Sequence, residues 1–193
     1  ITLKAAHAKD FLDKESEYLA LAQLLLLNQN PYWAAKVLES GQKKIVTYTE
    51  TVKDKITGKE TKVEKTGPVV RDNEKNLKLL ADSWRMAQEI DKAIPILEKA
   101  AKLSKDGKSF VLLGNLYLAE DKLDKAVDSI KKGLKKGEID KISQVHLTLG
   151  QAYFELQKFD DAKKEFRTAA RDKDKKIKTT ANNWIKYTEN EEI

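Results

Sequence analysis

The chain has 193 residues, of which 40% are hydrophobic and 35% are charged, with eight glycines and three prolines. This composition favours a helix-rich soluble protein over a β-sandwich, a linker or a disordered chain. The absence of cysteine excludes disulfides, thiol nucleophiles and thiolate metal sites, and it leaves the redox compartment open. The formal net charge is +6, but lysines alternate with acidic residues along most of the chain, as on a solvated helix surface. We therefore expect no nucleic-acid partner, since only four arginines offer the planar fork that reads base edges: Arg71, Arg85, Arg167 and Arg171.

The N-terminal segment, residues 1–14, carries Ile1, Ala5 and Ala8 at helical spacing. We interpret it as the remnant of a preceding helical unit or as a linker, because the chain begins without a methionine and has the character of a portion of a longer protein.

Residues 15–42 are predicted to form a pair of helices. The apolar run over residues 19–27 is much shorter than the roughly 20 residues that cross a bilayer, so we expect no membrane insertion. The apolar and small residues of this segment recur at helical spacing: Tyr18, Leu21, Ala22, Leu25, Ala34, Leu38 and Gly41.

Residues 43–73 form an insertion whose pattern changes from helical to alternating and is rich in threonine and valine. They predict a β-hairpin with a turn between Asp54 and Lys59, where Gly58 can adopt the positive φ that a tight reversal requires. Val52 and Val63 lie nearly equidistant from this turn, which leaves the register open by a residue or so. A two-stranded hairpin is marginal alone, so we expect some of its apolar side chains to contact the helices or another chain: Val46, Tyr48, Val52 or Val63.

Two roles are open for this hairpin. Its free edges or its tip can bind a partner by strand addition. Alternatively, it is a decorated loop whose lysines discourage edge pairing, and this second interpretation is favoured.

One pattern of large and small residues recurs three times, in residues 74–106, 107–142 and 143–176. Their markers are Ala81, Gly114 and Gly150, at steps of 33 and 36 positions. Residues 15–42 are a looser copy, placed 59 positions before the Ala81 copy because the hairpin is inserted between them. The matching residues are Leu80, Ala81, Trp84, Ala93, Leu97 and Ala100; then Leu113, Gly114, Tyr117, Ala126, Ile130 and Gly133; then Leu149, Gly150, Tyr153, Ala162, Phe166 and Ala169.

These residues and this period resemble the 34-residue tetratricopeptide repeat, in which Leu-Gly, Tyr, Ala and a large residue recur. The resemblance implies an all-α fold, a right-handed superhelix of about four helix pairs. It also accounts for a glycine inside an apolar helix, which costs about 1 kcal/mol in helix propensity. Small residues let paired helices approach closely, so we expect Gly114 and Gly150 to face Ala126 and Ala162.

Turns between the pairs are predicted at Asp106-Gly107, Lys136-Gly137 and residues 172–176. Pro95 is kept within its repeat, either in the first turn of the second helix or at a kink. Residues 177–193 are expected to form a capping helix with one apolar face on the preceding repeat: Ala181, Trp184, Ile185 and Tyr187. Its polar side chains then face water: Asn182, Asn183, Lys186 and Glu189.

No constellation in the sequence predicts catalysis. His7 and His146 are far apart in sequence and lack a flanking pattern of metal ligands. His146 occupies the large-residue position of its repeat, so we interpret it as a partly packed core histidine. The glycines occur singly, which does not fit a phosphate-binding loop. We therefore expect no enzyme, no catalytic residue, no metal and no cofactor.

In tetratricopeptide proteins the first helix of each pair lines a concave groove, so the resemblance places the candidate binding residues there. Asn and Gln side chains can hold a ligand backbone while Leu and Phe supply apolar contact, which suits an extended or helical peptide. Asn115 and Gln151 are the main candidates; the alternative is that these side chains pack between helices or face water. A clamp for a terminal carboxylate is disfavoured, since Lys78 is followed by Asp82 where such proteins carry Asn. The full set is Leu19, Gln23, Leu26, Lys78, Asp82, Arg85, Val111, Asn115, Leu118, Leu147, Gln151 and Phe154, with Leu27 and Met86 beside them.

Four strings resemble a narrower group: NPYWAAKVLE, NEKNLKLLADSW, DKAIPILEKAAKLSKDG and NNWIKY, at residues 30–39, 73–84, 91–107 and 182–187. They are similar to the C-terminal part of the tetratricopeptide proteins that accompany TonB, ExbB and ExbD energy-transduction systems in Gram-negative bacteria. The resemblance implies a non-catalytic periplasmic scaffold with TonB, ExbB or ExbD as partner, and the hairpin departs from that group.

Two other functions stay open. A general adaptor or co-chaperone-like assembly factor in the cytoplasm follows from the fold alone. A nucleic-acid-binding solenoid rests only on the positive charge, and it predicts an affinity that falls steeply with salt.

Overall fold

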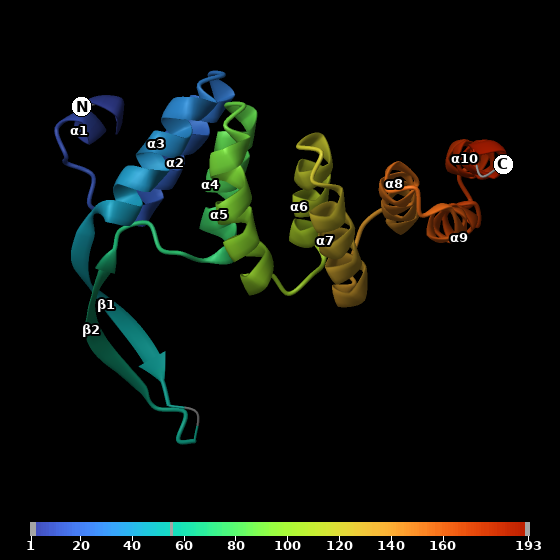
Figure 1. The fold of residues 1–193 in the computed structure, drawn as a ribbon. Helices are drawn as coiled ribbons and strands as arrows, with labels where there is room; N and C mark the ends of the chain where they lie inside the picture. Colours follow the sequence, from blue (N-terminus) through green and yellow to red (C-terminus); the bar gives the residue numbers. More distant parts are fainter. Residues whose placement is uncertain (1–2, 55, 192–193) are drawn as a thin grey trace. The chain divides into compact units, whose positions relative to one another are not determined.

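The computed structural model describes residues 3–54 and 56–191, and within them it contains ten helices and one two-stranded sheet (Figure 1). The expected fold of helical repeats with one inserted β-hairpin is confirmed. The chain divides into two compact units, unit 1 (residues 1–96) and unit 2 (residues 97–193). The elements are α1 (Leu3–Ala8), α2 (Glu15–Leu27), α3 (Pro31–Lys43), β1 (Ile45–Lys53), β2 (Glu60–Pro68), α4 (Glu74–Met86), α5 (Ile90–Leu103), α6 (Lys108–Ala119), α7 (Leu123–Lys136), α8 (Ile142–Glu155), α9 (Phe159–Ala169) and α10 (Lys175–Glu191).

The core of unit 1 lies between α2, α3 and α4. α3 packs on α2 on one side and on α4 on the other. Trp84 on α4 is 1% exposed, and its indole Nε1 donates a hydrogen bond to Glu39 Oε1 on α3 at 3.2 Å. The polar edge of this large buried ring is therefore satisfied. The buried apolar residues of the three helices are Tyr18, Leu21, Ala22, Ala34, Ala35, Val37, Leu38, Leu77, Leu80, Ala81 and Trp84.

The N-terminal helix α1 contacts the same core. His7 Nε2 lies 2.8 Å from Ser40 Oγ on α3, and the His7 ring meets the Tyr18 ring edge-on at 5.9 Å between centroids. Ala5 and Ala8 are exposed. Ile1, the first residue of the expected remnant, lies outside the described residues.

β1 and β2 pair antiparallel along their whole length, with Ile45 opposite Pro68 at the base. The register differs by two residues from one that would place the two nearly equidistant valines opposite each other: Val52 lies opposite Thr61, and Val63 lies opposite Glu50. Only the base of the hairpin contacts the helices: Val46 and Tyr48 are half-buried, whereas Val52 and Val63 are exposed.

The hairpin turn lies where the sequence predicts it. Gly58 has a φ of +69°, a conformation that glycine adopts without steric cost. Asp54 Oδ1 accepts hydrogen bonds from the backbone N–H of Thr57 at 2.7 Å and of Ile56 at 2.9 Å. These hydrogen bonds, Thr57 first, hold the pKa of the Asp54 carboxyl below its usual value.

Arg71, just after β2, joins the hairpin to the helices. Its guanidinium lies 5.5 Å above the Tyr48 ring centroid, and its Nη2 donates to Glu15 Oε2 at 3.1 Å. Burial raises the pKa of the Glu15 carboxyl, but hydrogen bonds from Arg71 and Asn76 outweigh it and lower the pKa. Backbone hydrogen bonds from Val69 and Val70 to the end of α3 complete the junction.

Pro95 lies in the second turn of α5 and is exposed. Because proline has no N–H, the carbonyl of Asp91 cannot receive the usual hydrogen bond from four residues further on. The helix nevertheless continues to Leu103. Pro95 therefore does not lie in the first turn, which was the first of the two alternatives expected for it.

In unit 2, the two glycines that mark the repeats lie inside α6 and α8 and are buried. A Cβ added to Gly114 would lie 2.4 Å from Ile130 Cγ1 and 3.2 Å from the Ala126 carbonyl oxygen. A Cβ added to Gly150 would lie 2.5 Å from Phe166 Cε1. The expected close helix crossings are confirmed, but the neighbours that require glycine are the large Ile130 and Phe166 side chains rather than the alanine side chains.

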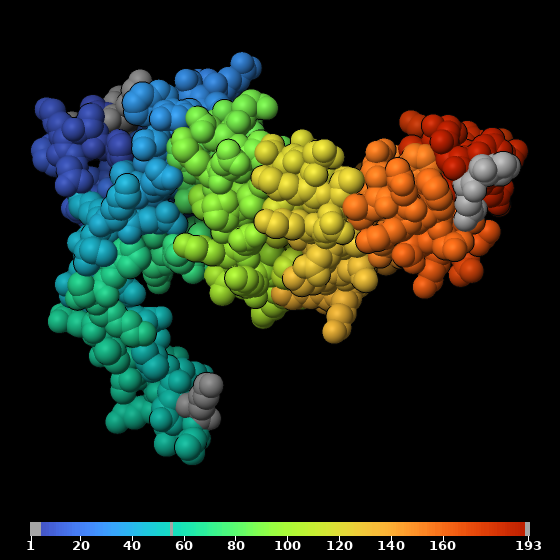
Figure 2. All heavy atoms as spheres, viewed as in Figure 1, coloured from blue at the N-terminus to red at the C-terminus, as the bar shows by residue number. Residues whose placement is uncertain are grey.

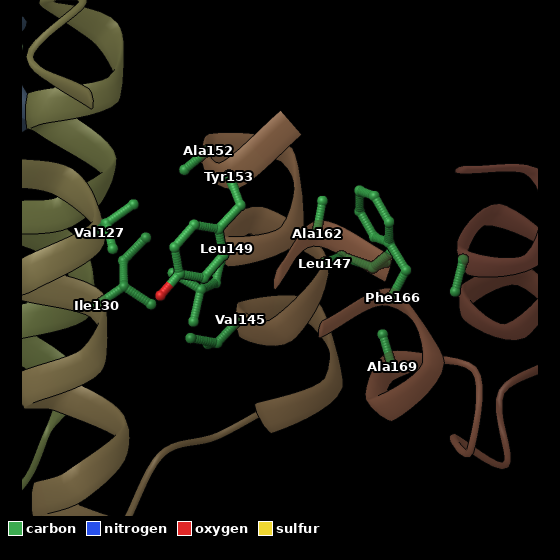
Figure 3. Close-up of a cluster of buried hydrophobic side chains, with 11 residues drawn as sticks. Val127, Ile130, Val145, Leu147, Leu149, Ala152, Tyr153, Ala162, Phe166 and Ala169 are labelled. Carbon is green, nitrogen blue, oxygen red and sulfur yellow. The ribbon is translucent and has the colours of Figure 1, made fainter. Parts of the chain in front are cut away.

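One hydrophobic cluster joins α7, α8, α9 and α10 (Figure 3). Leu149 and Tyr153 of α8 point toward Val127 and Ile130 of α7, while Phe166 of α9 lies on the other side of α8 (Figure 3). The cluster consists of Val127, Ile130, Val145, Leu147, Leu149, Ala152, Tyr153, Ala162, Phe166, Ala169 and Ala181.

The last helix, α10, packs on α9 and α8. Ala181 is fully buried, and the Trp184 ring stacks on Phe166 with centroids 5.5 Å apart and planes 18° apart. Tyr187, which was expected on the packed face, is 50% exposed. The expected polar face is exposed: Asn182, Asn183, Lys186 and Glu189.

Tyr117 on α6 is 5% exposed, and its hydroxyl donates a hydrogen bond to Glu98 Oε1 on α5. Burial, and then this hydrogen bond, raise the pKa of Tyr117 to about 12 from the ordinary 10.0. Since the folded pKa is the higher one, the neutral phenol stabilises the fold fully below pH 10, and this contribution is lost as the pH rises toward 12.

We predict that Tyr117→Phe removes the highest-pH part of the tyrosinate absorbance titration. The free energy of unfolding of the original chain should also fall more steeply between pH 10 and 12 than that of the variant. Equal slopes for the two proteins would contradict this role of Tyr117.

Candidate functional site

The candidate binding positions lie on the first helix of each pair. In unit 2 these helices are α6 and α8, which contact each other directly. Asn115 on α6 is exposed and Gln151 on α8 is partly exposed. Val111, Leu118 and Phe154 are partly buried and pack against the hydrophobic cluster with one side. We refer to these five residues as the α6–α8 face.

Leu147 does not belong to this face. It is 3% exposed and is a member of the hydrophobic cluster, so its expected place on an open groove is wrong. The physical reason is its position one helical turn before Gly150, on the side of α8 that packs against α9, where it lies beside Phe166 (Figure 3).

The α6–α8 face combines two kinds of contact. The amides of Asn115 and Gln151 each offer a donor and an acceptor, the pair of groups that a peptide backbone also presents. The apolar side chains Val111, Leu118 and Phe154 supply burial around them. None of the five residues carries a charge, so recognition here rests on hydrogen bonding and apolar contact.

An aromatic cluster extends this face to α10. The ring centroid of Phe154 lies 5.5 Å from that of Trp184 and 5.3 Å from that of Tyr187. On α10, Thr180, Asn183, Trp184 and Tyr187 line a shallow cavity of about 330 Å³. From the sequence, Trp184 and Tyr187 were expected only as part of a capping helix. Their spacing with Thr180 and Asn183, at i, i+3, i+4 and i+7, is the signal that predicts a single partly apolar stripe.

In unit 1 the positions on α2 are apolar or neutral: Leu19 and Leu26 are partly buried and Gln23 is exposed. Leu27, beside them, is 80% exposed.

The unit 1 positions on α4 are charged, and their charges are paired within the helix. Lys78 Nζ lies 3.5 Å from Glu74 Oε1, and Arg85 Nη2 lies 3.3 Å from Asp82 Oδ1. Met86, beside them, is 47% exposed. The pairing of Lys78 with a neighbouring carboxylate adds to the argument against a clamp for a terminal carboxylate.

Both histidines have side-chain partners. His146 Nδ1 lies 2.6 Å from Glu165 Oε2, and both side chains are largely buried between α8 and α9. Among residues 3–54 and 56–191, no three His, Asp or Glu side chains converge as metal ligands would. In the same part of the chain, no helix is long and apolar enough to cross a bilayer.

The geometry is that of a protein built from repeated helix pairs. Residues 107–135 and 143–171 match the family model of the tetratricopeptide repeat, and these segments coincide with α6–α7 and α8–α9. These two segments are therefore tetratricopeptide repeats.

Solved structures share the fold. The crystal structure of MamA has a TM-score of 0.64 and 19% identity, covering 91% of this chain and 86% of that one. YrrB, described as a TPR protein with an unusual peptide-binding site, has a TM-score of 0.63 and 13% identity, covering 97% of this chain and 83% of that one. The C-terminal part of a TPR repeat-containing protein from Cytophaga hutchinsonii has a TM-score of 0.61 and 14% identity, covering 86% of this chain and 55% of that one.

One curated protein is similar in sequence, the CTR9 homolog of Arabidopsis thaliana. It is 32% identical over 113 residues, which are 56% of this chain. The chain spans only 10% of the length of that protein.

Proposed function

We propose that this chain is a non-catalytic scaffold that binds an extended or helical segment of a partner protein on the α6–α8 face. The observation that carries the proposal is the placement of Asn115 and Gln151 on adjacent first helices, with apolar side chains beside both. Paired amides hold a peptide main chain in one register, while Val111, Leu118 and Phe154 select apolar side chains of the segment. The tetratricopeptide repeats of residues 107–135 and 143–171 support this use.

The finer proposal is a periplasmic accessory of a TonB–ExbB–ExbD energy-transduction system. It is supported by the four strings that resemble the tetratricopeptide proteins of such systems. The binding segment would then belong to the periplasmic part of TonB, ExbB or ExbD. The alternative is a general adaptor or co-chaperone-like assembly factor in the cytoplasm, which the repeat fold alone supports.

We predict that a periplasmic segment of TonB, ExbB or ExbD binds the chain in a calorimetric titration. The double variant Asn115→Ala, Gln151→Ala should bind the segment at least about tenfold more weakly, because it loses hydrogen bonds at the interface. Asn190→Ala, an exposed amide at the end of α10, is the matched control and should leave the affinity unchanged. Saturable binding that the double variant does not weaken would overturn the assignment to this face. Failure of all three segments to bind would overturn the TonB-system proposal.

The affinity for the segment should change little with ionic strength, since the α6–α8 face has no charged residue. Repeating the titration at about 50 and 300 mM salt tests this, because only charged contacts are screened over that range. A steep fall in affinity would instead favour a charged surface, as a nucleic-acid-binding solenoid requires.

A further inference from the structure

The two outer edges of the β-hairpin differ in chemistry. In an antiparallel pair, residues alternate between those that bond to the partner strand and those whose backbone groups point outward. Backbone hydrogen bonds join Asp54 to Lys59 and Val69 to Lys44, which fixes this alternation. The odd-numbered residues of β1 and the even-numbered residues of β2 therefore present free N–H and C=O groups at the outer edges.

The outer edge of β2 is protected against pairing. Charged side chains and proline discourage strand addition, and the edge positions of β2 are Glu60, Lys62, Glu64, Thr66 and Pro68. Pro68 in addition has no N–H to donate. The lysines and glutamates that discourage pairing are therefore concentrated on one side of the hairpin.

The outer edge of β1 lacks this protection. Its edge positions are Ile45, Thr47, Thr49, Thr51 and Lys53, with one charge at the tip end, and all five are exposed. Figures 1 and 2 show the hairpin extending away from α2 and α3, with contact only at its base. β-branched residues such as threonine favour strands and cross-strand pairs.

We propose that the outer edge of β1 pairs with β1 of a second copy of this chain, antiparallel and about a two-fold axis. The result is a four-stranded sheet in the order β2–β1–β1–β2, whose exposed edges are the two protected β2 strands. The axis passes beside Thr49, the central residue of Ile45–Lys53, so the whole strand takes part. This surface lies in the hairpin and does not depend on the α6–α8 face.

The sequence of β1 is complementary to itself in this register. Thr49 lies opposite its own copy, Thr47 opposite Thr51, and Val46 opposite Val52. These are pairs of β-branched residues, which stabilise sheets, and no like charges oppose each other. A shift of the axis by one residue toward the tip would place Glu50 opposite its own copy, which is unfavourable. A shift by one residue toward the base would place Val46 opposite Glu50 and remove the pairing of Val46 with Val52. This self-complementarity favours a second copy over an unrelated strand.

Proline substitutions test the proposal through the oligomeric state of the full chain. Thr47 and Thr66 lie opposite each other in the hairpin, and the N–H of each points to an outer edge, so neither Thr→Pro change removes a backbone hydrogen bond within the hairpin. Both changes remove the same contact between the two threonine hydroxyls, which are 3.4 Å apart, so the two variants are matched in this respect. We expect light scattering to show twice the mass of one chain for the original protein and for Thr66→Pro. Thr47→Pro should shift the dimer dissociation constant upward at least about tenfold. A chain that stays monomeric up to about 1 mM would overturn the proposal, and so would an equal effect of both prolines.

Cysteine substitutions test the register, because the chain has no cysteine of its own. Hydrogen-bonded partners across an antiparallel pair have Cα atoms about 5.5 Å apart, within the range of a disulfide. Thr49→Cys is therefore expected to form a covalent dimer under mild oxidation, and Thr66→Cys, on the protected edge, should remain a monomer on a non-reducing gel. Equal dimer yields from both variants would overturn the proposed pairing through the outer edge of β1. That outcome is also expected if the hairpin pairs with a strand of another protein and not with a second copy of this chain.

Discussion

Phe166→Ala is expected to lower the free energy of unfolding of unit 2 by about 3–5 kcal/mol, the range for removing a large buried aromatic side chain. Phe166 is 0% exposed and stacks on Trp184. Its ring also occupies the space that the missing side chain of Gly150 leaves open. Truncation therefore removes contacts with α8 and α10 at once and leaves a cavity that these helices cannot fill without moving.

Denaturant unfolding followed by circular dichroism measures this effect. Phe11→Ala is the control, since Phe11 is 60% exposed and its removal should cost well under 1 kcal/mol. A cost for Phe166→Ala no larger than that for Phe11→Ala would contradict the packing described for this cluster. The space above Gly150 gives a second check: Gly150→Ala should be less destabilising when residue 166 is leucine than when it is phenylalanine, because the shorter side chain relieves the clash.

Gly107→Ala is expected to destabilise the chain by about 3 kcal/mol, at the upper end of the usual cost of overpacking. Gly107 precedes α6, and a Cβ there would lie 2.1 Å from the carbonyl oxygen of Gly133 on α7. The neighbour is backbone, so the clash cannot be relieved by rotating a side chain. Gly107 N also donates to the Gly137 carbonyl oxygen at 2.8 Å, which restricts movement of the turn.

The control for Gly107→Ala is Gly67→Ala in β2. A Cβ on Gly67 would lie 3.6 Å from the Tyr48 ring, an ordinary van der Waals distance, so this change should be close to neutral. Thermal and denaturant unfolding of both variants provide the comparison. If Gly107→Ala proved as well tolerated as Gly67→Ala, the close approach of the α6 N-terminus to α7 would be contradicted.

The repeat period was sufficient to predict the helical pairs and the tight crossings at Gly114 and Gly150. A step of 33 or 36 positions shows which small residues share a role, and a glycine inside an apolar helix requires a steric reason. Gly107 was predicted only as part of a turn. Its approach to Gly133 depends on the backbone conformation just before α6, and the spacing of residue types in the sequence does not predict that conformation.

The accessibility of the two polar candidate residues was predictable from the sequence. Asn115 and Gln151 are accessible, as their repeat positions predict, whereas Leu147 is buried on the side of α8 that faces Phe166 of α9. The association of Phe154 with Trp184 and Tyr187 was not predicted, because it joins two helices whose spacing in the sequence differs from the repeat period. The hairpin register was also missed by two residues, since valine spacing alone does not fix the length of the turn.

The most direct test of the account is to map the binding surface with peptides chosen without assuming a partner. Linear peptides selected on the full chain by display would be titrated into 15N-labelled protein while the side-chain amide signals of Asn115 and Gln151 are followed by NMR. We expect the side-chain amide signals of both residues to shift when the protein is saturated with peptide. We also expect the Asn115→Ala, Gln151→Ala double variant to have no measurable affinity for the peptides. Peptides that bind without shifting either signal, and that the double variant retains, would contradict the account.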